Sequence, residues 1–210
     1  MKESSSNETN SFIFSTMETL TSVLIGIGLS AAAGFRLLVP FLALSVAAVF
    51  GHFPVSPDME WLNSFPALEA LAVGLLLEVL AFYIPWLDHA LDLVMLPASI
   101  MAGTLITAAF TSHLDPFLQW SLGIVAGGGA AAMTKTFAGG SRLTSTLTTG
   151  GLGNFIIATL EFIGAIVLSI LALVLPKLAI VLVLPLVGFL AWQGYRLWQS
   201  RQSTDLPSES

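Results

Sequence analysis

The chain has 210 residues, of which 55% are hydrophobic and 10% are charged, and its mean hydropathy is +0.88. Soluble domains carry roughly 25% charged residues, so this composition excludes an ordinary soluble globular protein and indicates that lipid is the solvent. The formal net charge of −6 and the 7 scattered basic residues argue against nucleic-acid binding, which needs clustered cations. Without cysteine, the chain has no disulfide framework and no thiol nucleophile.

Residues 1–19 are rich in Ser, Asn and Glu and are predicted to form a disordered cytoplasmic tail. A cleavable signal peptide needs a basic leader before a short apolar stretch, so we expect the first span to be retained. That span opens an apolar run at residues 20–50, which only Arg36 and Pro40 interrupt. As a straight helix the run would be about 46 Å long, which exceeds the roughly 30 Å of a bilayer core. The run therefore either tilts strongly or breaks near residues 34–40, where glycine and proline weaken the helix, and we predict the break.

Five more apolar segments complete a predicted all-α membrane domain of about six transmembrane helices over residues 20–198. Their expected bounds are 65–87, 90–110, 117–133, 155–175 and 178–198. The polar pair Asp88 and His89 separates the second span from the third. The stretch 134–154, rich in Gly, Thr and Ser, is too polar to face lipid, so we expect a loop or the lining of a protein cavity. Residues 199–210 are predicted to be a second disordered cytoplasmic tail.

Basic residues indicate the orientation of the spans, because they are concentrated in cytoplasmic loops. With a cytoplasmic N-terminus, the cations on or toward the cytoplasmic side are Lys2, Lys135, Arg142, Arg196 and Arg201. Lys177 falls on the other side. Both termini are therefore predicted to be cytoplasmic.

Two segments of the chain resemble each other and predict an internal repeat. GIGLSAAAGFR at residues 26–36 and GIVAGGGAAAMTK at residues 123–135 each begin with Gly-Ile, pass through a triple alanine and end on a cation. With three spans in each repeat, about 20–110 and about 117–198, the second repeat would enter the membrane from the opposite face. Interrupted helices are frequent in such inverted repeats, so we expect the first segment of each repeat to be broken or re-entrant.

Small residues recur every four positions in both of these segments. They are Gly26, Ser30 and Gly34 in the first, and Gly123, Gly127 and Ala131 in the second. This spacing places them on one helix face, where they let another helix approach closely. Pro40 is expected to mark the helix break. Close packing is the simpler interpretation of the small residues, and it is compatible with a solute site at the helix ends.

Ionisable residues inside the spans, or in the polar stretch between them, are the candidates for an intramembrane site. They are Arg36, Glu69, Glu78, Lys135, Arg142 and Glu161. Each costs roughly 2.5–3.5 kcal/mol in a bilayer, so such residues normally have partners or functions. We expect Arg36 and Lys135 to pair with Glu69 and Glu161, forming a gate or an anion or proton-coupled site. The alternative is that these pairs only neutralise one another and fix helix register.

Catalytic and metal chemistry have little support in the sequence. Asp88 and Asp92 share a helix face next to His89, but one histidine and two carboxylates are a weak metal pattern, and an interfacial cap is simpler. No serine is paired with a nearby base, and the Gly-rich residues 128–136 lack the order of a P-loop. The sequence therefore predicts no enzyme, no metal and no cofactor.

Three motifs together carry a family resemblance. They are GLSAAAGFRLLVP at residues 28–40, the Glu69-bearing span, and STLTTGGLGN at residues 145–154. With them, the chain resembles a bacterial family of small integral membrane proteins that is classed as a domain of unknown function. The resemblance covers residues 20–198 and implies the bacterial cytoplasmic membrane, without an activity or site residues.

Three functions stay open at this point. A small transporter or channel for an unidentified solute explains both the repeat and the charges inside the spans. A membrane scaffold or assembly factor without transport activity is the alternative. A membrane enzyme that acts on lipid has the least support, because no catalytic set is recognisable. The expected partners are the lipid bilayer and a small solute or ion, and association into a homo-oligomer is left open.

Overall fold

The computed structural model describes residues 2–51, 53–81 and 85–183, together with residues 185, 188, 192 and 196, and in this part of the chain every regular element is helical. The elements are α1 (Lys2–Phe35), α2 (Leu38–Gly51), the 3₁₀ helix η1 (Pro57–Leu62), α3 (Phe65–Ala81), α4 (Pro85–Phe110), α5 (Pro116–Leu122), the π-helical stretch η2 (Gly123–Gly128), α6 (Gly129–Thr149) and α7 (Asn154–Val174). Residues 176–183 are also helical. The predicted all-α class is confirmed, whereas the predicted tail 199–210 and most of the predicted span 178–198 lie outside the described residues.

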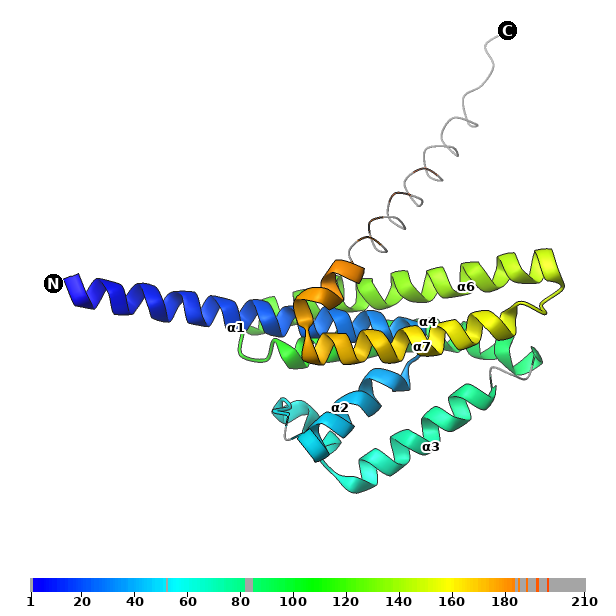
Figure 1. Ribbon diagram of the computed structural model, residues 1–210, viewed down its shortest axis with the longest axis horizontal. Helices are drawn as coiled ribbons and strands as arrows, with labels where there is room; N and C mark the ends of the chain where they lie inside the picture. The colour runs from blue at the N-terminus through cyan, green and yellow to red at the C-terminus, as the bar shows by residue number, and fades with distance from the viewer. Residues whose placement is uncertain are drawn as a thin grey trace, which may run out of the picture.

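Four helices, α1, α4, α6 and α7, lie side by side with roughly aligned axes, and α2 and α3 cover one side of them (Figure 1). The central helix is α1, because it packs against α4, α6 and α7. α2 packs against α3 and α7, whereas α3 lies at the edge and contacts chiefly α2. Both α6 and α7 extend past the end of α1, so the break between α1 and α2 falls within the length of the bundle (Figure 1).

The break itself follows from Pro40. In a continuous helix, residue 40 would donate its backbone N–H to the carbonyl of Arg36, but proline has no N–H and its ring clashes with that carbonyl. The chain instead ends α1 at Phe35 and starts α2 at Leu38, within the stretch where the sequence predicts a break. Pro40 then lies in the first turn of α2, where proline is tolerated. α2 turns back toward the end of the bundle from which α1 enters (Figure 1).

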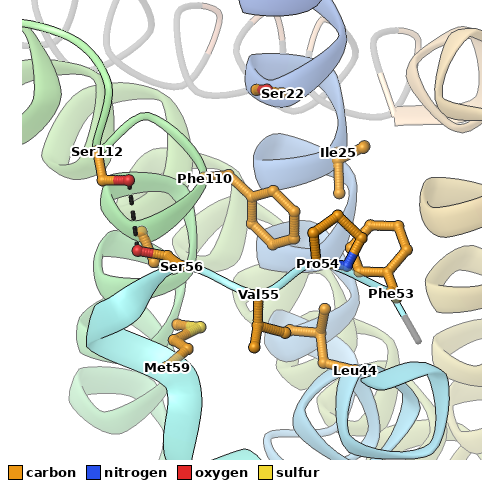
Figure 2. Close-up of a pocket in the computed structure, with 11 residues that line it drawn as sticks. Ser22, Ile25, Leu44, Phe53, Pro54, Val55, Ser56, Met59, Phe110 and Ser112 are labelled. Carbon is orange, nitrogen blue, oxygen red and sulfur yellow. Dashed lines mark hydrogen bonds between the residues drawn. The ribbon is translucent and has the colours of Figure 1, made fainter. Parts of the chain in front are cut away.

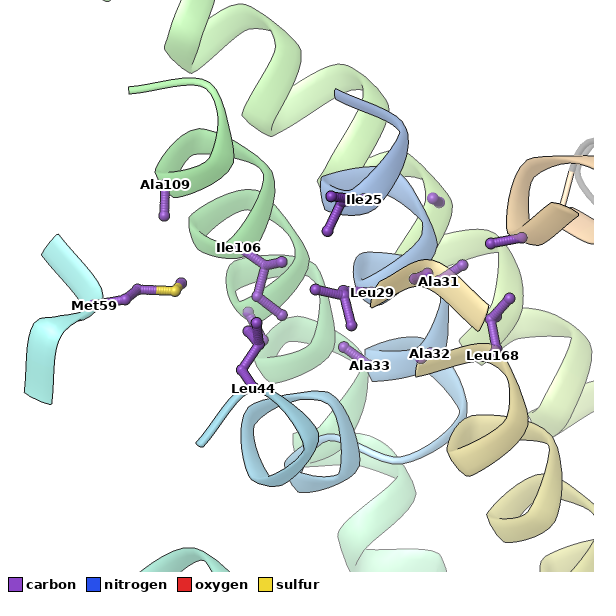
Figure 3. Close-up of a cluster of buried hydrophobic side chains, with 14 of the residues drawn as sticks. Ile25, Leu29, Ala31, Ala32, Ala33, Leu44, Met59, Ile106, Ala109 and Leu168 are labelled. Carbon is purple, nitrogen blue, oxygen red and sulfur yellow. The ribbon is translucent and has the colours of Figure 1, made fainter. Parts of the chain in front are cut away.

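Small side chains form much of the buried core. Ala31, Ala32 and Ala33 are fully buried in α1, and Leu29 and Ile106 pack with them in the same cluster (Figure 3). Since alanine projects little beyond the backbone, three neighbouring helices can approach α1 closely on different faces. The triple alanine of the predicted repeat is therefore part of the bundle centre.

Both small-residue faces meet the same part of α4. Ser30 donates a hydrogen bond from Oγ to the carbonyl of Gly103 at 2.7 Å, and its Oγ lies 2.9 Å from Oγ1 of Thr107. From the other side, Gly127 packs so closely on Gly103 that a Cβ on Gly103 would lie 2.7 Å from the carbonyl oxygen of Gly127. α4 is thus the common partner of the two segments that resemble each other. Only glycine fits this crossing without displacing backbone.

Of the two alternatives predicted for the polar stretch 134–154, a loop or the lining of a protein cavity, the loop is wrong, because α6 stays helical to Thr149. Its hydroxyl groups bond back to the preceding turn: Thr144 donates to the carbonyl of Gly140 at 3.0 Å, and Thr148 to that of Thr144 at 2.9 Å. Such bonds satisfy the polar side chains within the helix itself. The helix ends where Gly150 takes a left-handed conformation with φ 64.

Two other expectations differ from the structure. Asp88 and His89, expected between two spans, lie within α4, which begins at Pro85, a residue type suited to the first helical position. Residues 2–19, expected to be a disordered tail, continue α1. Extending an existing helix fixes one residue for each hydrogen bond gained, so polar residues can follow an apolar helix without a new nucleus. The side chains of the metal-pattern residues Asp88, His89 and Asp92 lie outside the described part.

Two helices of the described chain are long and apolar enough to cross a membrane, Thr16–Phe35 and Asn154–Val174. The apolar helices Leu38–Gly51 and Val94–Phe110 are shorter. The length and composition of these two helices therefore indicate membrane association for this protein.

Candidate functional site

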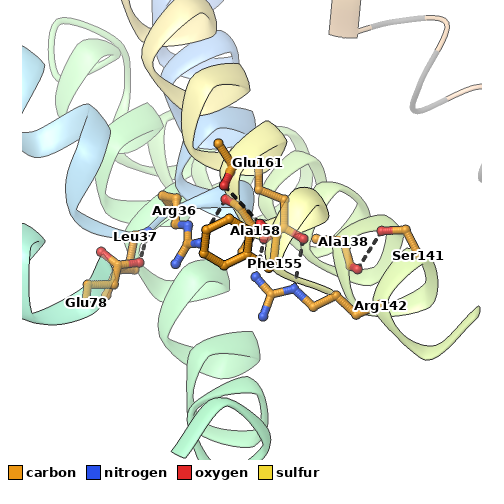
Figure 4. Close-up of polar contacts among 10 residues, drawn as sticks. Arg36, Leu37, Glu78, Ala138, Ser141, Arg142, Phe155, Ala158 and Glu161 are labelled. Carbon is orange, nitrogen blue, oxygen red and sulfur yellow. Dashed lines mark hydrogen bonds and ion pairs between the residues drawn. The ribbon is translucent and has the colours of Figure 1, made fainter. Parts of the chain in front are cut away.

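Five of the six candidate ionisable side chains are buried around the break between α1 and α2. They are Arg36, Glu78, Lys135, Arg142 and Glu161, and none is more than 6% exposed. Glu78 comes from α3, Glu161 from α7, and the lysine and second arginine from α6. Figure 4 shows four of these side chains around the break, and we call all five the charged cluster.

Arg142 and Glu161 form an ion pair between α6 and α7. Nε of Arg142 donates to Oε1 of Glu161 at 3.0 Å, and Nη2 contacts Oε2. An arginine fork that uses both carboxylate oxygens in this way is a strong and directional contact. Each residue is seven positions from the α6–α7 turn, counted from Thr149 and from Asn154, which is about 10 Å along the helix. The ion pair therefore joins the two helices well inside their hairpin.

Glu78 closes the start of α2. Its two carboxylate oxygens accept hydrogen bonds from the backbone N–H groups of Leu37 and Leu38, at 3.0 and 3.1 Å. The first N–H groups of a helix have no partner within the helix, and the helix dipole places partial positive charge at the same point. A carboxylate from α3 thus satisfies both donors and attaches α3 to the break.

Two of the cations lie near this carboxylate. Nη2 of Arg36 donates to the backbone carbonyl of Ala158 on α7 at 3.0 Å, and the charges of Arg36 and Lys135 both act on Glu78. The cluster contains three cations and two carboxylates, and one of these carboxylates lies at the N-terminus of α2. Buried positive charge and backbone N–H donors are the groups that bind carboxylates and phosphates. The arrangement can therefore hold an anion.

The comparisons with known proteins give one positive result. Residues 23–196 match the family model described as Domain of unknown function (DUF4126). The chain belongs to this family. The matched region contains the break and all five residues of the charged cluster. The expected membership of an uncharacterised family is thus confirmed, while no curated protein and no solved structure matches the chain.

Of the two carboxylates expected to pair with Arg36 and Lys135, the structure of this DUF4126 protein brings only Glu161 to the charged cluster. Glu161 forms its ion pair with Arg142, and Glu69 is exposed on α3, outside the charged cluster. Glu69 and Glu78 are nine residues apart, which is about 900° of helix rotation, so they lie on opposite faces. With Glu78 directed to the break, Glu69 has to face outward.

Several groups that contribute to the site could not be identified from the sequence. The backbone N–H groups of Leu37 and Leu38 and the carbonyl of Ala158 carry no side-chain signal. Gly103 and Thr107, four positions apart in the predicted third span, do carry one, because small residues at this spacing indicate a helix contact. That signal could have located the partner of the two small-residue faces.

Two of the cavities in the described part of the DUF4126 chain are lined by several helices and by no residue of the charged cluster. One, of about 280 Å³, lies between α1, the end of α4 and residues 53–56, where Ser56 Oγ donates to Ser112 Oγ at 3.3 Å (Figure 2). The other is a groove of about 600 Å³ between α2 and α7, with Leu75 of α3 at its side. We call it the α2–α7 groove.

Proposed function

We propose that this DUF4126 protein crosses the membrane about six times, with both termini cytoplasmic, and carries a small anionic solute across it. The observation that carries the proposal is the charged cluster, whose five ionisable side chains are buried at one helix break. Each of them is costly inside a bilayer, and ionisable residues concentrated at one place in a membrane protein often mark the path or site of a charged solute. A binding site for a charged solute accounts for this concentration.

The contacts of α4 support a common role for the two segments that resemble each other, residues 26–36 and 123–135. The two segments run parallel, because Ser30 and Gly127 both lie at Gly103 and, further along each segment, Gly34 lies at Thr134. The predicted inversion of the second repeat would give them opposite directions. Here the paired segments 26–36 and 123–135 both pack on Gly103 of α4, and each ends on a cation of the charged cluster. Both cations therefore reach the charged cluster from the same direction.

The balance of charge supports an anion over a cation. Arg36 and Lys135 both act on Glu78, and the carboxylate of Glu78 receives two backbone N–H bonds at the start of α2. A cation at this place would meet two positive side chains and the positive end of a helix. A solute carboxylate or phosphate would find the same donors that now hold Glu78.

Transport can be measured in liposomes that contain the purified protein. Electrical current is recorded after a concentration jump of chloride, inorganic phosphate, succinate or the amphiphile decanesulfonate. We expect a current with at least one of these anions. Lys135→Met and Glu161→Gln should each reduce it at least about tenfold, the rate effect of only 1.4 kcal/mol.

Glu69→Gln is the matched control, because Glu69 is exposed on α3 and lies outside the charged cluster. This variant should keep the full current. The proposal fails if none of the four anions gives a current above protein-free liposomes. It also fails if Lys135→Met and Glu161→Gln lower thermal stability but leave the current unchanged, because the charges would then serve packing alone.

A membrane scaffold without transport activity is the second candidate, and the outer face of α3 favours it. Val73, Leu76, Leu77 and Leu80 are all more than half exposed on a helix that packs chiefly on α2. Such an apolar face can receive another transmembrane helix. A scaffold predicts that charged substitutions on this face abolish a complex isolated from the native membrane while the charged-cluster variants leave the complex intact.

A further inference from the structure

The α2–α7 groove differs from the rest of the surface in being both hollow and wholly apolar. Its volume is about 600 Å³, and α2, α7 and α3 all contribute to its walls. Typical wall residues are Val39, Ala43, Ala47, Phe162, Ile166 and Ile170. Val46 and Val174 at its margin are 44% and 68% exposed, so the groove opens to the outside of the bundle. In a bilayer, a groove of this character faces lipid chains.

One end of the groove adjoins the charged cluster. Val39 follows Leu38, whose N–H binds Glu78, and Phe162 follows Glu161. Leu75 precedes Glu78 by three positions on α3, so both side chains lie on the same helix face. The apolar α2–α7 groove therefore ends beside the buried cations and beside the helix-end N–H donors that Glu78 occupies.

We propose that the α2–α7 groove and the charged cluster together bind an acyl-chain amphiphile with one anionic head group, such as a fatty-acid anion. The chain lies in the groove between α2 and α7. The head group binds the N–H groups of Leu37 and Leu38 and the cations Arg36 and Lys135, in place of the Glu78 carboxylate. The inference rests on the proposed function, because it names the class of anion that the charged cluster takes.

Two features of the structure are compatible with replacement of the Glu78 carboxylate by the anionic head group. The Glu78 carboxylate already shows that a carboxylate fits the donors of Leu37 and Leu38 at hydrogen-bond distance. Since α3 contacts chiefly α2, a shift of α3 removes Glu78 from the site without opening the α1, α4, α6 and α7 bundle. Head group and carboxylate are then competitors for one set of donors.

The test uses full-length protein in phosphatidylcholine nanodiscs and a palmitate analogue with a diazirine in the middle of its chain. After illumination, mass spectrometry should place the crosslinks on the walls of the α2–α7 groove. Unlabelled palmitate should compete with the probe, whereas hexadecanol, which has the chain without the anion, and succinate, which has the anion without the chain, should not.

Variants then assign the two halves of the site. Ala47→Trp fills the groove and should abolish the crosslinks, while Ala72→Trp, at an exposed position of α3 outside the groove, should not. Arg36→Met should weaken palmitate binding about tenfold, the effect of losing one charge-assisted contact. Glu78→Gln should strengthen palmitate binding by a similar factor, because the competing carboxylate loses its charge.

The outcomes separate this inference from the proposed function. Absence of crosslinks in the groove, or equal competition by hexadecanol, overturns the amphiphile, and currents of chloride, phosphate or succinate would still support transport. Crosslinks that palmitate competes away, without a current for any anion, support the binding site and overturn transport. If Glu78→Gln weakens palmitate binding, the head group does not replace Glu78 and the inference fails.

Discussion

The two segments that resemble each other, residues 26–36 and 123–135, are followed by different backbone structures after their last cation. After Arg36 the chain breaks and turns back as α2, whereas after Lys135 it continues as α6 to Thr149. Up to that point both segments are helical and both pack on α4. The difference between them therefore arises in the residues that follow.

The decisive residue is four positions past each cation. Pro40 follows Arg36 at this distance, and Gly139 follows Lys135. Glycine weakens a helix but can still donate its N–H, whereas proline cannot and also clashes with the carbonyl four residues earlier. One backbone hydrogen bond thus decides whether the helix stops near the cation or continues past it.

Polar groups are satisfied differently in the two regions. At the break, the N–H groups of Leu37 and Leu38 have no acceptor within their own helix, and the carboxylate of Glu78 on α3 accepts both hydrogen bonds. In α6 the backbone satisfies itself, and the buried charge of Arg142 is matched by Glu161. The broken region depends on a tertiary cap, and the continuous region depends on an ion pair.

The largest effect is expected in the continuous region, at its ion pair. Arg142→Met leaves Glu161 buried without this partner, and breaking such a pair costs roughly 3–5 kcal/mol of unfolding free energy. The loss is measured by unfolding in mixed detergent micelles. Adding Glu161→Leu should recover most of it, because a matched apolar pair has no buried charge. A double variant as unstable as the single one would show that the ion pair is not the source of the loss.

A proline at the equivalent position should make the second segment behave like the first. Gly139→Pro removes the N–H that a helix donates to the carbonyl of Lys135, and a proline inside a helix costs about 3 kcal/mol or more. Hydrogen exchange should become faster in α6 around residue 135. Unchanged exchange there would mean that Pro40 does not explain the break in the first segment.

The cap of the broken region should have an intermediate effect. Glu78→Gln keeps one acceptor oxygen but loses the charge and the second acceptor, so stability should fall by about 2 kcal/mol. Hydrogen exchange at Leu37 and Leu38 reports the loss directly. The same change at the exposed Glu69 on α3 should stay within about 0.5 kcal/mol. Equal effects at both positions would contradict the cap.

The smallest expected effect is a gain in stability from a substitution at Gly139. Gly139 is helical, and a Cβ built on it meets nothing within 4 Å. Gly139→Ala should therefore raise the unfolding free energy by roughly 0.5–1 kcal/mol through helix propensity. Because it occupies the same position as Gly139→Pro, it separates the effect of proline from the effect of any side chain. A loss of stability would show that the site is more crowded than the structure indicates.

The sequence predicts the break at residues 34–40 because its cause is local. Pro40 acts on a carbonyl only four residues away, so no other helix has to be placed first. The helix over residues 134–149 escapes prediction for a related reason. Threonine and serine favour loops and caps by composition, but their hydroxyls are satisfied equally well by carbonyls of the preceding turn, as at Thr144.

By itself, the sequence determined the helical class, the position of the first break and which ionisable residues belong to the candidate site, apart from Glu69. These properties follow from hydropathy and from backbone chemistry within one segment. Only the tertiary structure decided that Glu78 caps α2, that Arg142 holds Glu161 and that α4 receives both small-residue faces. Those contacts depend on how each helix is rotated about its axis and which neighbour it meets, and residues far apart in the chain set both.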